Sequence, residues 1–247
     1  MRRSRWTLQL LAQHSGVLGR VTSRSGVSRR LRSWKLSYKR GRTRLWSPDR
    51  AYSRKERRVR ALVKQGRRRE AIVLFADEKT FYRQPTPGKA WAETGSGGRL
   101  QATARRACSA NNTHRLVGAL NVATGRLVFG SAPKIGVRVL CCFLRHIRQS
   151  YGSRREIFLI WDNWPVHRHE EVVREAAKQR ITLVWLPTYA PWLNPIEKLW
   201  KKLEEEVLRL HRHSTQWEEL KELVWAFLSQ FKQASRALLR YVGLLPD

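Results

Sequence analysis

The chain has 247 residues, of which 42% are hydrophobic, so a core can be buried and wholesale disorder is excluded. It carries 50 Lys and Arg against 19 Asp and Glu, a formal net charge of +31, and residues 1–70 hold 23 of the basic residues but 3 acidic ones. Such a field attracts a polyanion, which favours a nucleic-acid partner over the alternative, a merely basic protein of ribosomal type. No run of about eighteen apolar residues exists, which excludes a membrane-spanning helix.

The basic segment 1–45 is predicted to form a small helix-turn-helix region. Trp6–Gln13 has helical spacing of apolar residues, and Ser23–Trp34 begins with a serine and repeats apolar residues on one face. A helix with arginines on its other faces suits the major groove of DNA. The alternative is an ordinary basic amphipathic helix with a solvated face. The residues expected to contact DNA here are Arg24, Ser28, Arg29, Arg32, Lys39 and Arg40.

The rest of the chain divides into a basic linker helix within 46–70 and an α/β region over 71–247. Short apolar runs predict buried strands, and residues 113–122 and 126–129, separated by Ala-Thr-Gly, predict a hairpin. The alternation of strands with helices predicts one mixed sheet flanked by helices. The expected further strands are 71–77, 157–162 and 181–186, and the expected helices are 52–68, 136–150, 170–179 and a long one from Asn194 onward.

Three carboxylates stand where such a sheet places chemistry. The chain has four aspartates, and two of them, Asp77 and Asp162, are at the C-terminal ends of apolar strands, while Glu197 opens the helix after the third strand. Active sites of open α/β sheets lie at those strand ends. If the three side chains converge, their repulsion requires a divalent cation, and oxygen ligands favour Mg²⁺ or Mn²⁺.

Each carboxylate also has a purely structural interpretation. An aspartate at a strand end often bonds the following turn. Asn194, Pro195 and Glu197 fit an N-cap, a first-turn proline and a capping-box acid, which would account for Glu197 without any chemistry. Glu78 points to the opposite face from Asp77 if the strand continues, so it is treated as secondary.

Three blocks of the sequence resemble the catalytic blocks of the IS630 branch of the IS630/Tc1/mariner transposase superfamily. They are Phe75–Glu78, Trp161–His167 and Leu186–Trp200, and the 34 residues between Asp162 and Glu197 match the spacing of that branch. Phe81, Trp91, Gly95 and the Gly118–Gly125 hairpin also sit where the family has them. The resemblance is strong over about 71–210 and looser over 6–70.

This resemblance implies an RNase H-like fold preceded by a winged-helix-like helix-turn-helix region. It also implies cut-and-paste transposition: metal-dependent cleavage at transposon ends and strand transfer, with TA dinucleotides as targets. Asp77, Asp162 and Glu197 would hold two Mg²⁺ ions, for which Mn²⁺ can substitute. Asn163 and His167 would either support the carboxylates from behind or contact DNA, and Tyr189 and Asn194 would line the path of the DNA.

The implied partners are terminal inverted repeats, target DNA and a second copy of the chain, in the bacterial cytoplasm at the nucleoid. Family members usually carry two helix-turn-helix units, and this chain begins at about the second. The alternative function is therefore a truncated, catalytically weak remnant that binds DNA as a repressor. A cellular RNase H-like nuclease is a further alternative, which the block Pro187–Glu197 disfavours.

Overall fold

The computed structural model describes residues 7–14, 23–37, 46–89, 103–108, 110–152 and 155–245. The chain forms two compact units, Met1–Leu45 and Trp46–Asp247, and each is considered by itself. Four residues singled out in the sequence, Lys39, Arg40, Trp91 and Gly95, lie outside the described residues.

The described residues of the first unit form two helices, α1 (Leu8–Gln13) and α2 (Arg24–Ser33), which pack against each other. The hydroxyl of Ser23 accepts a hydrogen bond of 3.0 Å from the amide of Gly26, so the predicted serine start of α2 is confirmed. Val27 is buried, whereas Arg24, Arg29 and Arg32 are exposed. The helix therefore buries Val27 of the expected apolar face and exposes the expected arginines, while its DNA contacts stay a prediction.

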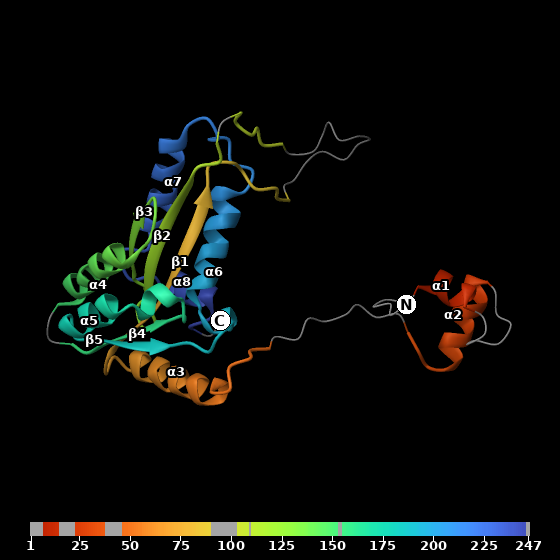
Figure 1. Ribbon diagram of the computed structural model, residues 1–247, viewed down its shortest axis with the longest axis horizontal. Helices are drawn as coiled ribbons and strands as arrows, with labels where there is room; N and C mark the ends of the chain where they lie inside the picture. The colour runs from red at the N-terminus through yellow and green to blue at the C-terminus, as the bar shows by residue number, and fades with distance from the viewer. Residues whose placement is uncertain are drawn as a thin grey trace. The chain divides into compact units, whose positions relative to one another are not determined.

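The second unit is built on a mixed sheet whose five strands lie in the order β3-β2-β1-β4-β5 (Figure 1). β1 pairs antiparallel with β2 and parallel with β4, and β5 continues the parallel side. The apolar runs make buried strands because helices cover both faces of the sheet. The bounds are β1 Ile72–Tyr82, β2 Thr113–Asn121, β3 Leu127–Ala132, β4 Ile157–Trp161 and β5 Ile181–Trp185.

Alternate residues of β1 enter two separate hydrophobic cores. Val73 and Phe75 face the core formed with α3 (Tyr52–Arg67), α6 (Ile196–Leu203), α7 (Trp217–Ser229) and α8 (Arg236–Val242). Ile72 and Leu74 face the core formed with α4 (Val137–Tyr151) and α5 (Glu170–Lys178). The predicted linker helix is thus not a free connector, because α3 packs on the sheet through Val59 and Leu62.

Three predicted boundaries are wrong, and the simplest is that of β3, which was expected to end at 129 and ends at Ala132. β1 does not end at Asp77 but runs on to Tyr82, because β2 continues to pair with it as far as Thr113. The predicted long helix from Asn194 begins at Ile196 and ends at Leu203, followed by a π-helical turn over Glu204–Leu208. Beyond that turn the chain is extended at Arg209, where it forms a bridge with Thr86 that a continuing helix would exclude.

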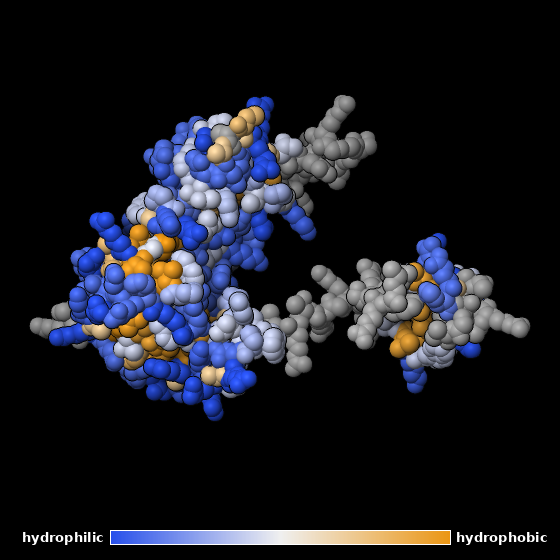
Figure 2. Space-filling view, viewed as in Figure 1, coloured by the Kyte–Doolittle hydropathy of each residue, from blue (hydrophilic) through white to orange (hydrophobic). Residues whose placement is uncertain are grey.

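The surface of the second unit is largely hydrophilic on the face in Figure 2, with apolar side chains showing mainly where α4 and α5 lie. Arginines of α3 and charged residues of α6 and α7 account for much of the polar cover, since their apolar sides are used in the core. Among the helices of the described ranges, none has the length and apolarity needed to span a bilayer.

Candidate active site

Two aspartates stand level with each other on neighbouring strands. β1 and β4 pair in parallel as far as Phe75 and Ile160, so Asp77 and Asp162 each follow two residues further along their strand. Asp162 comes directly after β4, whereas Asp77 lies inside β1, at the point where only β2 still pairs with it. The expected placement at a strand end holds for Asp162 and is wrong for Asp77, which lies inside β1 just beyond its parallel pairing with β4.

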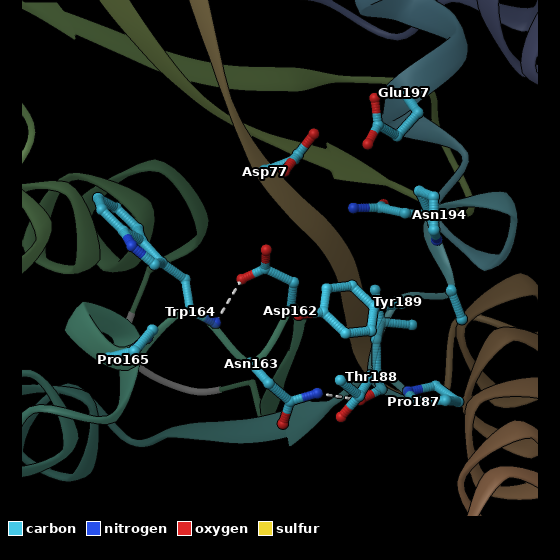
Figure 3. Close-up of a pocket in the computed structure, with 13 residues that line it drawn as sticks. Asp77, Asp162, Asn163, Trp164, Pro165, Pro187, Thr188, Tyr189, Asn194 and Glu197 are labelled. Atoms are coloured by element: carbon cyan, nitrogen blue, oxygen red, sulfur yellow. Dashed lines mark hydrogen bonds between the residues drawn. The ribbon is translucent and has the colours of Figure 1, made fainter. Parts of the chain in front are cut away.

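Glu197 joins them from the first turn of α6. All three carboxylates line one cavity of about 500 Å³, together with the segment Leu186–Pro191 and Asn194. Figure 3 shows the three side chains converging on one space from β1, from the residue after β4 and from α6. The three carboxylates that the sequence analysis selected, far apart in the chain, are therefore neighbours in space.

The purely structural interpretation of Glu197 is not supported. No side chain caps the start of α6, and the side chain of Asn194 turns away to donate to the carbonyl oxygen of Ala76 at 3.1 Å. Asp162, by contrast, does bond its own turn, because Oδ1 accepts from the amide of Trp164 at 3.0 Å. A turn role and a place in the cavity thus coexist at Asp162.

Asp77 is buried and has one aromatic hydrogen-bond donor. Nε1 of Trp200, one turn after Glu197 on α6, donates to Oδ2 of Asp77 at 2.9 Å. Room for the indole exists because the residue opposite Asp77 in β2 is Gly118, where a Cβ would lie 2.9 Å from Cη2 of Trp200. Burial, followed by the nearby charges of Glu197 and Glu78, raises the pKa of Asp77 to about 8.

Asp162 belongs to a chain of three polar side chains behind the cavity. Nδ1 of the fully buried His167 lies 2.7 Å from Oδ1 of Asp162, and Nε2 lies 3.0 Å from Oε1 of Glu78. The imidazole stacks on Trp161 with ring centroids 3.9 Å apart. Burial alone would lower the pKa of His167, but hydrogen bonds to Asp162 and Glu78 raise it to about 9. As expected, Glu78 points to the opposite face of β1 from Asp77. There it contacts His167, which in turn contacts Asp162.

Glu197 has a cationic neighbour that the sequence analysis did not single out. Lys79 forms an ion pair of 3.1 Å with Glu204, and Glu204 also accepts from the hydroxyl of Thr86 at 2.8 Å. Loss of solvent around its carboxyl raises the pKa of Glu197, Lys79 opposes that rise and Asp162 adds to it. Lys79 follows Asp77 by two residues on β1, so strand alternation is the signal that would have revealed it.

The expected DNA contacts near the cavity divide into three groups. His167 is fully buried, so the prediction that its side chain contacts DNA directly is wrong. It lies instead behind Asp162, in the supporting position. Tyr189 is 77% exposed on the cavity wall with a φ of +53°, a conformation rare for a side-chain-bearing residue. Asn194 is buried but lines the cavity.

Asn163 lines the same cavity and is held at both ends of its amide. Its Nδ2 donates to the carbonyl of Leu186 at 2.5 Å, and its Oδ1 accepts from Arg168 at 2.5 Å. Arg168 also lies over the ring of Trp185. A DNA phosphate at this point would therefore meet the exposed guanidinium of Arg168 as well as the amide of Asn163.

A short segment before α3 is hydrogen-bonded to the cavity wall. Ser47 donates through Oγ to the carbonyl of Thr188, and the amide of Thr188 donates to Oδ2 of Asp49 at 3.0 Å. Asp49 also binds Lys55 at 2.7 Å, and that hydrogen bond, with the one from Thr188, lowers the pKa of Asp49 to about 2. Asp49 is one of only four aspartates in the chain. The sequence analysis singled out Asp77 and Asp162 from these four but not Asp49.

The donor set of the cavity fits a hard divalent cation. Three carboxylates and the amide oxygen of Asn194 supply only oxygen atoms, the ligands that Mg²⁺ and Mn²⁺ prefer. A cation would also offset the repulsion that raises the pKa of Asp77. Within the described ranges no three Asp, Glu, His or Cys side chains are grouped closely enough to hold a metal ion as they stand.

Comparison with known sequences points to one group of enzymes. Residues 72–221 match the family model described as DDE superfamily endonuclease. A protein of the insertion element IS630 from Shigella sonnei, described as an uncharacterized 39 kDa protein, is 27% identical over 227 residues. That alignment covers 90% of this chain and 63% of the relative, so the chain spans less than two thirds of the relative's length.

Comparison with solved structures shows that the chain shares its fold with the Mos1 transposase. The chain superposes on the Mos1 transposase paired-end complex with left transposon end with a TM-score of 0.64 at 18% identity, covering 98% of this chain and 71% of that one. For the Mos1 strand transfer complex the TM-score is 0.63 at 18% identity, with 97% and 70% covered. The predicted RNase H-like arrangement, a mixed sheet flanked by helices after an N-terminal helical region, is confirmed.

Proposed function

The chain belongs to the DDE superfamily endonucleases, in the IS630/Tc1/mariner group of transposases, and from this premise we propose that it cleaves DNA at transposon ends and joins those ends to target DNA. The observation that carries the proposal is the meeting of Asp77, Asp162 and Glu197 in one cavity, from three separate elements. These three residues are the proposed catalytic carboxylates. They lie in a strand, in a turn and in a helix, so no single role in local structure explains why the three carboxylates meet.

In the proposed mechanism the carboxylates hold two Mg²⁺ ions, or Mn²⁺ in their place. The bound ions would activate a water and then a 3′-hydroxyl for in-line attack on a phosphodiester and would stabilise the leaving oxygen. The chain's own residues fix the geometry. Trp200 orients Asp77 through its indole N–H, and His167, itself bound to Glu78, orients Asp162. The burial of these supporting groups restricts the directions in which the carboxylates can point.

The proposed path of the DNA runs along the open side of the cavity. A shallower groove shares Asn163, Pro165 and Thr188 with the cavity and adds the cations Lys55 and Arg168. Tyr189 lines the cavity and is largely exposed. The arginines of α2 would bind terminal-repeat DNA, and the net charge of +31 supplies the general attraction to phosphate. We further propose TA target sites and a dimer on DNA, as in the family, at the nucleoid.

The test is single-turnover cleavage of labelled duplexes that carry the flanking terminal repeats, with Mg²⁺, with Mn²⁺ and with EDTA. Asp77→Asn, Asp162→Asn and Glu197→Gln should each abolish nicking, a loss of at least 10³-fold, on the order expected when a metal-ion mechanism is removed. Glu205→Gln is the matched control, because Glu205 is exposed and pairs only at 3.8 Å with Lys201 and Arg209. Cleavage that survives in the triad variants would disprove the assignment.

The alternative is a remnant that binds transposon ends without cutting them. It shares the charge and the fold, and the intact carboxylate cavity favours the enzyme over it. The same experiment separates the two functions. Tight, salt-sensitive binding of terminal-repeat DNA with no metal-dependent nicking would identify the remnant, whereas equal cutting of generic RNA–DNA hybrids would identify a cellular nuclease.

A further inference from the structure

Asn194 is the one neutral polar side chain that reaches the carboxylate cavity from the segment just before α6. It is 4% exposed and lines the cavity with Asp77, Asp162 and Glu197. Figure 3 shows its side chain extending from that segment toward Asp77, below Glu197. An amide so deeply buried has an oxygen and two N–H groups to satisfy, and an unsatisfied one costs on the order of 1–3 kcal/mol.

The orientation of this amide is determined by β1. Nδ2 donates a hydrogen bond of 3.1 Å to the backbone carbonyl of Ala76, the residue before Asp77. Rotating the amide by half a turn would set Oδ1 against that carbonyl, two acceptors in contact, so the observed orientation is the favourable one. Oδ1 is thereby turned away from the backbone of β1, and it has no hydrogen-bond partner among the described residues.

Local structure does not account for the oxygen. Asn194 was expected as the N-cap of α6, but no side chain caps that helix. The other polar side chains that line the cavity, Asn163, Thr188 and Tyr189 as well as the carboxylates, do not donate to Oδ1 in the described part of the chain. A direct contact with DNA bases would require exposure that a residue 4% exposed does not have. A cation bound in the cavity would satisfy Oδ1, because amide carbonyl oxygens are ligands of hard divalent ions.

We propose that Oδ1 of Asn194 is a fourth oxygen ligand of the divalent cation in this cavity, beside Asp77, Asp162 and Glu197, an inference that rests on the proposed function. A neutral ligand adds an oxygen without adding charge. That matters here because mutual repulsion of the carboxylates is already the electrostatic cost of the site. The hydrogen bond to Ala76 attaches Asn194 to the strand that carries Asp77. The ligand oxygens of Asn194 and Asp77 are therefore held in fixed positions relative to each other.

The test is Mn²⁺ binding to the full-length protein without DNA, followed by electron paramagnetic resonance of the free ion. Asn194→Ala should weaken binding by about tenfold or more, in the range seen when groups around a metal are removed. Asn194→Asp restores an oxygen but, like alanine, cannot donate to Ala76, and it should bind Mn²⁺ at least as tightly as the unchanged protein. Asn121→Ala is the matched control, expected within twofold, because Asn121 is an equally buried amide outside the cavity whose oxygen already accepts from the amides of Ala123 and Thr124.

Two results would overturn the proposal. One is an Asn194→Ala protein that is folded by circular dichroism and binds Mn²⁺ as tightly as the unchanged chain. The other is an equal loss in Asn194→Ala and Asn194→Asp, which would assign the effect to the missing bond to Ala76.

Failure of the proposed function looks different. If the unchanged protein binds no Mn²⁺ and Asp77→Asn makes no difference, the carboxylate metal site itself is disproved, and the role of Asn194 with it. If Mn²⁺ binds in the expected order of variants but no DNA is cut, the ligand assignment stands and transposase activity does not.

Discussion

Nε1 of Trp200 donates a hydrogen bond of 2.9 Å to Oδ2 of Asp77, so a helix and the middle strand of the sheet share one polar contact inside the core. Trp200 is 1% exposed and stands one turn after Glu197 on α6. The same helix therefore brings one proposed ligand and orients another. The two carboxylates are coupled by a rigid aromatic side chain rather than by a loop.

Trp200→Phe should keep most of the apolar contact and lose this hydrogen bond. We expect about tenfold slower metal-dependent cleavage and about 2 kcal/mol less stability, the cost of leaving a buried carboxyl without its donor. Urea unfolding and single-turnover cleavage measure the two effects. Trp161→Phe is the comparison, because Trp161 is equally buried but its Nε1 has no partner in the described part of the chain. Equal slowing of cleavage in both variants would show that ring volume alone matters.

Gly118→Ala should disturb the hydrogen bond between Trp200 and Asp77, because Gly118 of β2 lies against the indole. Its Cβ would lie 2.9 Å from Cη2 of Trp200 and 3.2 Å from Cδ1 of Ile196, so the indole has to move. We expect a loss of about 2 kcal/mol in the free energy of unfolding, typical of overpacking, together with slower cleavage. Gly130→Ala is the control, since its Cβ would meet only Cγ1 of Val117 at an ordinary 3.8 Å. Matching stabilities of the two variants would contradict the steric argument.

Glu78→Gln should weaken the support of Asp162. The variant removes the charge that holds Nε2 of His167 at 3.0 Å, and His167 in turn contacts Asp162. Cleavage should fall by about tenfold while affinity for terminal-repeat DNA in EDTA stays unchanged, because Glu78 is on the far side of β1 from the cavity. Glu170→Gln, which removes an exposed carboxylate paired with Arg174, should leave both quantities unaltered. A drop in DNA affinity with an intact cleavage rate would refute this role for Glu78.

Asp49→Asn tests the segment bonded to Thr188. The pKa of Asp49 is lowered to about 2, below its ordinary value of 3.8, so its ionised form stabilises the folded state above pH 4, and that contribution is lost as the pH falls from about 4 to 2. The variant should be less stable by roughly 1 kcal/mol at neutral pH, after allowance for solvent screening. Thermal unfolding between pH 3 and pH 7 measures the difference, which should shrink toward the acid end. A difference that is constant with pH would rule out the charge as its source.

The strands and the carboxylates were accessible from the sequence because their signals are local. Apolar runs predicted β4 and β5 to within one residue, and the rarity of aspartate directed attention to positions 77 and 162. Whether β1 ended at Asp77 was not a local matter. Its continuation depends on β2, which pairs with it up to Tyr82 and supplies Gly118 opposite the carboxylate.

The contacts of the supporting residues could not be predicted, because the partners are far away in the chain. A supporting role for His167 was one of the two roles that the family resemblance implied, but its contact with Glu78, 89 residues earlier, has no local signal. Asn194 carries every local mark of a helix cap, but a backbone carbonyl 118 residues away competes successfully for its amide. Local propensity is a weak guide wherever a buried partner from another element satisfies a polar group better than the nearest turn does.

The hydrogen bonds from Ser47 and Asp49 to Thr188 have a mechanical consequence. They are made by the first residues of the second unit, which begins at Trp46, before the chain enters α3. A force applied to the chain at Trp46 would therefore load the segment beside Tyr189, through Ser47, Asp49 and Thr188, before it reached α3.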